Sequence, residues 1–224
     1  MDIAVFVLSL LPGVAWLFFY LQEDLHPEPR SLLSLVFFAG MVSALAALFL
    51  QTAANGSLDG LGVAVFSPVS LIVLALIEEF CKFAAAWLVI RKNPEFDEPV
   101  DAMIYMIVAA LGFATLENVG ALLGKAPHLA DFGFAVQTTS LRFVGATLLH
   151  TLTSGLVGYY WATDIRRFYS SRFIAMGLLL ATILHAAFNY LIISYGELSY
   201  ALLFVVVVGF FILSDFEKLR DKMV

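Results

Sequence analysis

Two adjacent glutamates and a lysine interrupt an apolar stretch that is long enough to cross a lipid bilayer. Glu78, Glu79 and Lys82 lie in the middle of the run from about Pro68 to Ile90. An ionised side chain at the centre of a membrane helix costs about 2.5–3.5 kcal/mol even on the forgiving insertion scale. Lys82 reaches either carboxylate, because residues three and four apart share a helix face. One lysine neutralises only one of the two glutamates, so the second glutamate must be protonated, pair with another cation or bind a metal.

The composition predicts that the whole chain is an integral membrane protein. Of its 224 residues, 62% are hydrophobic and 13% are charged, whereas soluble domains are nearer half apolar and a quarter charged. The single cysteine, Cys81, excludes an intrachain disulfide and a thiolate zinc cluster. The sequence contains no basic run with interleaved aromatic residues, so nothing in it indicates nucleic-acid binding. The first apolar segment lacks a basic start, which favours a retained span over a signal peptide.

Apolar runs of about 20 residues predict about seven membrane-spanning helices. Turn-forming residues separate them, and we expect a break at Asn55-Gly56-Ser57. Since backbone groups in lipid must be satisfied internally, the chain should form an all-α polytopic bundle, a single integral-membrane domain over residues 1–224. The expected spans are Ile3–Leu21, Ser31–Gln51, Ser67–Ile90, Val100–Leu123, Leu141–Ala162, Arg172–Ser194 and Ser199–Ser214.

The lysines and arginines between the spans predict an orientation with the N-terminus outside and the C-terminus in the cytoplasm. Most of them then lie on the cytoplasmic side, and the outer loops hold Lys125 and Arg142. We expect Arg142 and Asp101 near the membrane surfaces, where exposed charge anchors a helix. Counting about 1.5 Å per residue from the outer ends of the spans places the glutamate pair in the outer half of the membrane.

Further ionisable residues fall in the same outer half and belong to other spans. Carboxylates and imidazoles are donors of catalytic zinc sites, which use three protein ligands and a water. Asn189, one turn after His185, could donate to a developing oxyanion. The alternative is that these groups only join helices through hydrogen bonds. The candidate donors are Glu78, Glu79, Glu117, His150 and His185.

Four motifs together resemble the PrsW family of intramembrane proteases in their order and spacing. The resemblance covers nearly the whole chain, and the related type II CAAX prenyl proteases and the Aph subunit of gamma-secretase are less similar. That larger group has an arginine and a histidine where this chain has Lys82 and Glu117. The four motifs are Glu78-Glu79-x-x-Lys82, Phe113-x-x-x-Glu117-Asn118, His150 in the following span, and His185-x-x-x-Asn189.

The resemblance implies an intramembrane endopeptidase, a glutamate-dependent metalloprotease that uses zinc. Its substrate would be a single-span membrane protein such as an anti-sigma factor, cut on the extracytoplasmic side of a prokaryotic cell membrane as the first step of a stress response. Glu78 would be the general base, with Glu79 either a further zinc ligand or the partner of Lys82. A metal-free, glutamate-activated water remains open. The residues implied as zinc ligands are Glu117, His150 and His185, and the others implied in catalysis are Glu79 and Asn189.

Three other functions remain open from the sequence. Thr153-Ser154-Gly155 half resembles the rhomboid serine motif and would supply a Ser154–His185 dyad. An ion- or proton-coupled transporter would also gather acidic, histidine and lysine side chains near the membrane centre. A catalytically silent scaffold like Aph would use the same histidines for packing.

Overall fold

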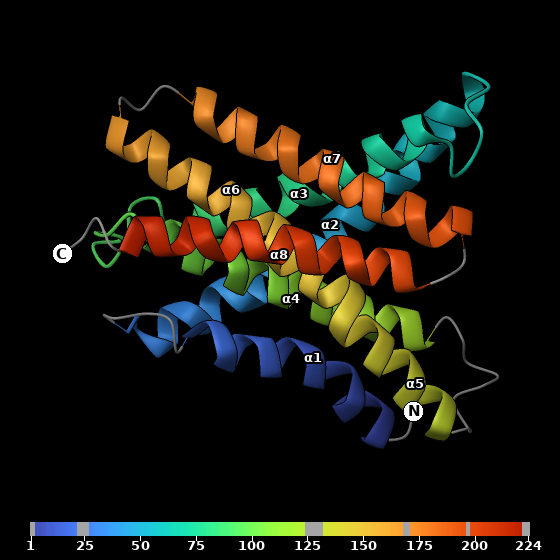
Figure 1. Cartoon of the computed structure of the whole chain (residues 1–224), viewed down its shortest axis with the longest axis horizontal. Coiled ribbons are helices and arrows are strands. Elements are labelled where there is room, and N and C mark those ends of the chain that lie inside the picture. The colour runs from blue at the N-terminus through green and yellow to red at the C-terminus, as the bar shows by residue number, and fades with distance from the viewer. Residues whose placement is uncertain (1–2, 22–26, 124–131, 168–170, 196–197, 221–224) are drawn as a thin grey trace.

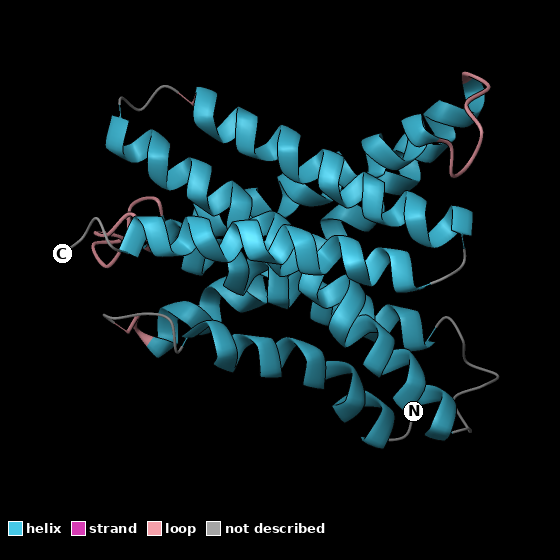
Figure 2. Cartoon of the chain, viewed as in Figure 1, coloured by secondary structure: helices cyan, strands magenta, loops and turns pink. Residues whose placement is uncertain are grey.

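Every element that the structure describes is a helix (Figure 1, Figure 2), which confirms the all-α class. The computed structural model describes residues 3–21, 27–123, 132–167, 171–195 and 198–220. In chain order the elements are α1 (Ile3–Leu21), α2 (Arg30–Gly60), α3 (Pro68–Ile90), α4 (Asp101–Leu123), α5 (Phe132–Arg142), the π-helical segment η2 (Phe143–Thr147), α6 (Leu148–Arg167), α7 (Arg172–Tyr195) and α8 (Leu198–Arg220).

Helix α4 forms the centre of the bundle and packs against α1, α2, α3 and α6. Every residue from Asp101 to Thr115 is buried, as expected for a helix that is apolar on all sides. Figure 1 shows α1 on one side of α4 and α6 and α7 on the other. The side chains of the cluster described below come from α3, α4, α6 and α7; α4 packs against α3 and α6, and α7 packs against the same two helices.

Two glycines let α4 and α2 touch at their backbones. A Cβ atom at Gly112 of α4 would lie 1.9 Å from the carbonyl oxygen of Phe37. A Cβ atom at Gly40 of α2 would lie 2.0 Å from the carbonyl oxygen of Ala109. Small residues allow such close approach between membrane helices, and neither position has room for any larger residue.

The boundaries of α1, α3, α4 and α7 agree with the expected spans to within one residue. The break expected at Asn55-Gly56-Ser57 is wrong, because α2 continues to Gly60. The Ser57 hydroxyl donates to the carbonyl oxygen of Ala53 at 3.1 Å, within the helix. The chain turns instead at Gly62, whose φ of 74° suits glycine.

The fifth expected span, Leu141–Ala162, is part of a longer helical run through α5, η2 and α6. At η2 the Trp16 indole donates to the carbonyl oxygen of Phe143 at 3.0 Å, and the two rings stack with centroids 5.2 Å apart. Helix α8 likewise extends beyond the seventh expected span, Ser199–Ser214. Apolar character alone therefore underestimated both helices, because it does not detect their more polar ends.

Within the described residues, three helices are long and apolar enough to cross a membrane, namely α2, α4 and α7. Val7–Tyr20 and Ser199–Phe211 are shorter apolar segments. Helix α3 has 23 residues but carries Glu78, Glu79 and Lys82. The seven spans and the orientation with the N-terminus outside stay predictions.

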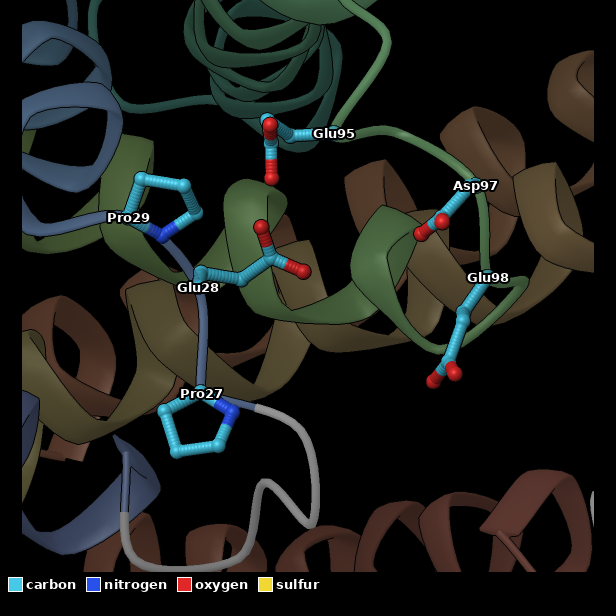
Figure 3. Close-up of a pocket in the computed structure, with 6 residues that line it drawn as sticks. All are labelled: Pro27, Glu28, Pro29, Glu95, Asp97 and Glu98. Carbon is cyan, nitrogen blue, oxygen red and sulfur yellow. The ribbon is translucent and has the colours of Figure 1, made fainter.

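A cavity of about 420 Å³ lies beyond the C-terminal end of α3 and is lined by acidic side chains (Figure 3). The Tyr105 hydroxyl donates to Glu28, and Asp101 Oδ2 accepts from the backbone N–H of Asp97 at 3.1 Å and of Glu98 at 2.8 Å. Asp101 was expected to expose its charge at the membrane surface, but it is 1% exposed. Its carboxylate is buried because it caps these backbone donors ahead of α4.

We expect Gly112→Ala to destabilise the protein by about 1–3 kcal/mol, since the added methyl group would overlap the backbone of α2. Thermal unfolding of the purified protein in detergent measures the loss. Gly120→Ala on the same helix is the matched control, because a Cβ there meets nothing within 4 Å. Equal melting temperatures for the two variants would contradict the close contact between α2 and α4.

Candidate active site

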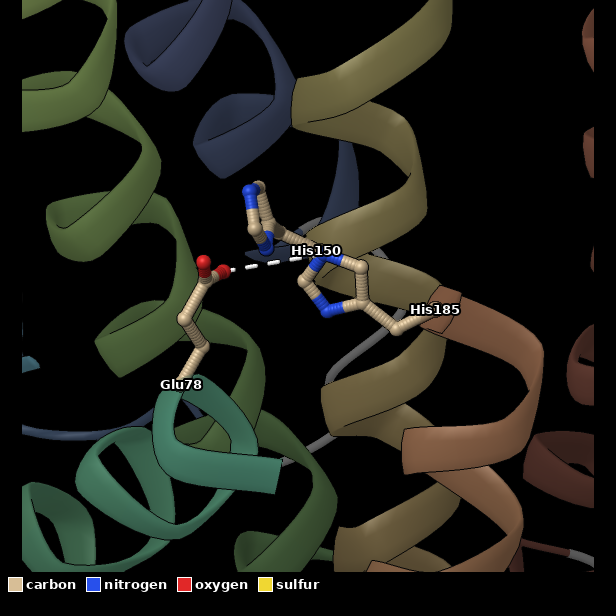
Figure 4. A group of neighbouring side chains, drawn as sticks. All are labelled: Glu78, His150 and His185. Carbon is tan, nitrogen blue, oxygen red and sulfur yellow. Dashed lines mark ion pairs between the residues drawn. The ribbon is translucent and has the colours of Figure 1, made fainter. Parts of the chain in front are cut away.

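Four helices bring a cluster of charged and imidazole side chains together inside the bundle. Glu79 and Lys82 are fully buried, and His150 and His185 are each 2% exposed. Figure 4 shows Glu78 of α3 pointing toward His150 of α6 and His185 of α7. The cluster consists of Glu78, Glu79, Lys82, Glu117, His150 and His185.

Glu79 accepts three hydrogen bonds at one oxygen. Its Oε1 lies 2.7 Å from Lys82 Nζ, 2.7 Å from His185 Nδ1 and 3.0 Å from the Thr153 hydroxyl. A carboxylate that is paired with an ammonium group accepts, so Nδ1 of His185 must donate. The proton of a neutral His185 is then on Nδ1, and its Nε2 keeps a free lone pair.

Lys82 also fixes the protonated nitrogen of His150. Its ammonium group lies 3.1 Å from His150 Nδ1, and because an ammonium group has no acceptor, Nδ1 accepts. The ring proton is therefore on Nε2, which lies 2.8 Å from Glu117 Oε2. Lys82 thus joins the glutamate pair of α3 to the imidazole of α6.

Glu117 is held by an arginine as well as by His150. An Arg142 guanidinium nitrogen lies 3.4 Å from Glu117 Oε2, and Arg142 also donates to the side-chain oxygen of Asn118. The expectation that Arg142 merely anchors a helix at the membrane surface is wrong. It ends α5 directly before η2, and its side chain turns inward because Glu117 and Asn118 offer acceptors there.

Glu78 differs from the other two acids because no lysine or arginine pairs with it in the described residues. The Gln51 amide of α2 donates to Glu78 Oε1 at 2.7 Å. The second oxygen, Oε2, is buried and accepts no hydrogen bond. It lies 3.6 Å from His185 Nε2, an ion pair when His185 carries a second proton; when His185 is neutral, two lone pairs face each other with no hydrogen bond between them.

This arrangement fits a divalent metal ion. Glu78, His150 and His185 can each offer a ligand atom, and these atoms lie within 4.8 Å of one another. Two imidazoles and a carboxylate are a donor set of catalytic zinc sites. A cation would satisfy the facing lone pairs of Glu78 and His185, whereas His150 could bind it only by releasing Lys82 or Glu117.

Two other residues from the sequence analysis lie outside these contacts. Asn189 is half-buried one turn after His185, and no hydrogen bond joins it to another residue in the described ranges. Ser154 is buried, and its hydroxyl has no partner there. The structure therefore offers no Ser154–His185 hydrogen bond, and the oxyanion role of Asn189 stays a prediction.

Sequence reasoning missed Gln51 and Thr153 as members of the site. Gln51 was taken as the end of a span, although a polar amide at the end of an apolar run is a signal in itself. Thr153 was considered only as part of a serine motif. Both contact acids on α3, which no spacing along the chain could indicate.

The protein-family model for the PrsW family intramembrane metalloprotease matches residues 28–214. Protease PrsW of Geobacillus kaustophilus is 31% identical over 194 residues, which cover 83% of this chain and 78% of the relative. Protease PrsW of Bacillus subtilis is 26% identical over 97% of this chain and 96% of the relative. Protease PrsW of Clostridioides difficile is 24% identical over 93% of this chain and 87% of the relative. No solved structure gives a significant match.

We expect Lys82→Met to destabilise the protein by about 3–5 kcal/mol, because it leaves Glu79 as an unpaired buried charge. Thermal unfolding in detergent measures the loss, and Lys92→Met, at an exposed position, is the control. Adding Glu79→Gln to Lys82→Met should recover part of the stability by removing the charge. A Lys82→Met variant as stable as the Lys92→Met control would refute the pairing.

Proposed function

The chain belongs to the PrsW family of intramembrane metalloproteases, and we propose that it cleaves a single-span membrane protein, such as an anti-sigma factor, on the extracytoplasmic side. The cut would be the first of a stress-response cascade in a prokaryotic cell membrane. Family membership favours this enzyme over the transporter and the silent scaffold. The proposal treats residues 1–224 as one integral-membrane domain with the N-terminus outside.

The observation that carries the proposal is the meeting of Glu78 Oε2 and His185 Nε2, 3.6 Å apart in the buried interior. Free lone pairs that face each other are unfavourable unless a cation or a proton lies between them. His150 completes a set of three donors. We assign zinc to Glu78, His150 and His185 on the chemistry of this set.

The neighbouring side chains prepare these donors for hydrolysis. When bound, zinc supplies Lewis-acid polarisation of a water and of the scissile carbonyl. Glu79 orients His185 through Nδ1, as carboxylates commonly do for metal-binding histidines. Lys82 neutralises Glu79, so that the orienting carboxylate adds no net charge to the buried site.

Glu117 is the acid best placed to accept a proton from water. Its side chain is 30% exposed, against 11% for Glu78. The water oxygen bonds to the scissile carbonyl carbon, its proton passes to Glu117 and then to the departing amine nitrogen, and the carbon–nitrogen bond breaks. Asn189 would donate to the oxyanion that forms on the way. These roles are the reverse of those expected from the sequence, in which Glu78 is the base and Glu117 is a ligand.

We expect Glu78→Gln and His185→Ala to lower the cleavage rate by at least about a hundredfold, because each removes a ligand of the metal that would polarise the reacting water. The measurement uses protein reconstituted in liposomes with a panel of single-span reporter proteins. Mass spectrometry of the fragments identifies the scissile bond and its side of the membrane. Glu95→Gln, at an exposed position outside the cluster, should cleave like the wild type. Retained cleavage by both site variants would refute this mechanism.

Metal analysis distinguishes the two assignments of Glu78 and Glu117. If Glu78 is a ligand, Glu78→Gln should lower the zinc content of the purified protein, whereas Glu117→Gln should keep the zinc and lose cleavage. The opposite pattern would support the assignment made from sequence. Removal of metal by a chelator should abolish cleavage, and added zinc should restore it. Full activity in chelator with less than one zinc per several chains would instead indicate metal-free activation of water.

A further inference from the structure

Gln51 links α2 to α3 at the position of Glu78. Its side-chain nitrogen lies 2.7 Å from Glu78 Oε1 and 3.2 Å from the carbonyl oxygen of Leu74. Both partners only accept hydrogen bonds when Glu78 is ionised, so the amide nitrogen of Gln51 must face them. An amide nitrogen carries two hydrogens, and these two contacts use both.

The contact makes the two oxygens of Glu78 different. Rotation about the last bond of a glutamate side chain is broad and nearly two-fold, so a free carboxylate exchanges its oxygens easily. In this structure Oε1 is held by Gln51, while Oε2 accepts no hydrogen bond and faces His185. The amide therefore selects the oxygen that remains available.

Gln51 also lies where the buried acids meet a groove. A groove of about 300 Å³ between α2 and α4 is lined by Gln51 and Glu117 together with apolar side chains such as Leu48 and Phe113. Leu48 is 62% exposed, whereas Phe113 is 1% exposed, so the lining runs from the outside of the bundle to its interior. Gln51 therefore lies beside the reacting groups and outside the packed core along α4.

We propose that Gln51 is a positioning residue for Glu78. Its amide holds Oε1 and presents Oε2 toward His185, so that the carboxylate binds metal through a defined oxygen. The inference rests on the proposed function in placing Glu78 among the metal ligands. Residues that orient a metal ligand affect metal affinity even though they do not touch the metal.

Gln51→Met tests this role, because methionine has a similar length but no hydrogen-bond donor. We expect the affinity for zinc, measured by competition with a chelator, to fall about tenfold or more. On any reporter protein that is cleaved, kcat should fall while KM changes little. Gln137→Met, at an exposed position on α5, is the matched control and should bind zinc like the wild type. Unchanged zinc affinity in a folded Gln51→Met variant, or a loss of thermal stability alone, would overturn the proposal.

If Gln51→Met folds poorly, an exchange of the side chains of Gln51 and Glu78 provides a second test. Gln51→Glu places two carboxylates together and should lower the melting temperature. Combining it with Glu78→Gln again places an amide donor opposite a carboxylate acceptor. The double variant should recover most of the lost thermal stability, but not zinc binding. A double variant no more stable than Gln51→Glu would overturn the proposal. Because zinc affinity and stability need no substrate, failure of every reporter to be cleaved would count against the proposed function alone.

Discussion

The ion pair between Lys82 and Glu79 is the contact on which the rest of the cluster depends. Burial of either charge alone would be strongly unfavourable, and additional hydrogen bonds support the pair, from His185 and Thr153 to Glu79 Oε1 and from Lys82 to His150. Those same bonds determine which nitrogen of each histidine carries the proton, through Glu79 for His185 and through Lys82 for His150. The charged pair of α3 therefore sets the chemical state of two imidazoles on other helices. That explains why a lysine occupies a position where charge is expensive.

The sequence allowed the helices and the members of the cluster to be predicted because both depend on local signals. An apolar run of fixed length determines a span, and α1, α3, α4 and α7 begin and end close to where the runs do. Ionisable residues inside such runs are unfavourable enough to indicate a site, and Glu117, His150 and His185 do meet the glutamate pair. The resemblance to PrsW rested on the same residues, so family and site were predicted together.

The contacts between the helices could not be predicted, since they depend on how the helices are rotated against one another. Gln51 and Thr153 are ordinary polar residues until α2 and α6 place them beside acids of α3. Arg142 resembled a surface anchor because it lies near the end of an apolar run, yet the π-helical segment η2 follows it and its side chain reaches Glu117. The break expected at Asn55-Gly56-Ser57 was wrong for a different reason, because an exposed helix end tolerates glycine at a cost of about 1 kcal/mol.

The length of α2 bears on how water reaches a buried hydrolytic site. A helix of 31 residues is about 46 Å long at ~1.5 Å per residue, which exceeds the ~30 Å hydrocarbon core of a bilayer. With Arg30 at one interface, Gln51 lies about 32 Å along the helix, and the residues after it extend past the other interface. On that placement Gln51 would mark the depth at which hydrocarbon gives way to water. Acids just below that level would need no channel through the bundle to be hydrated.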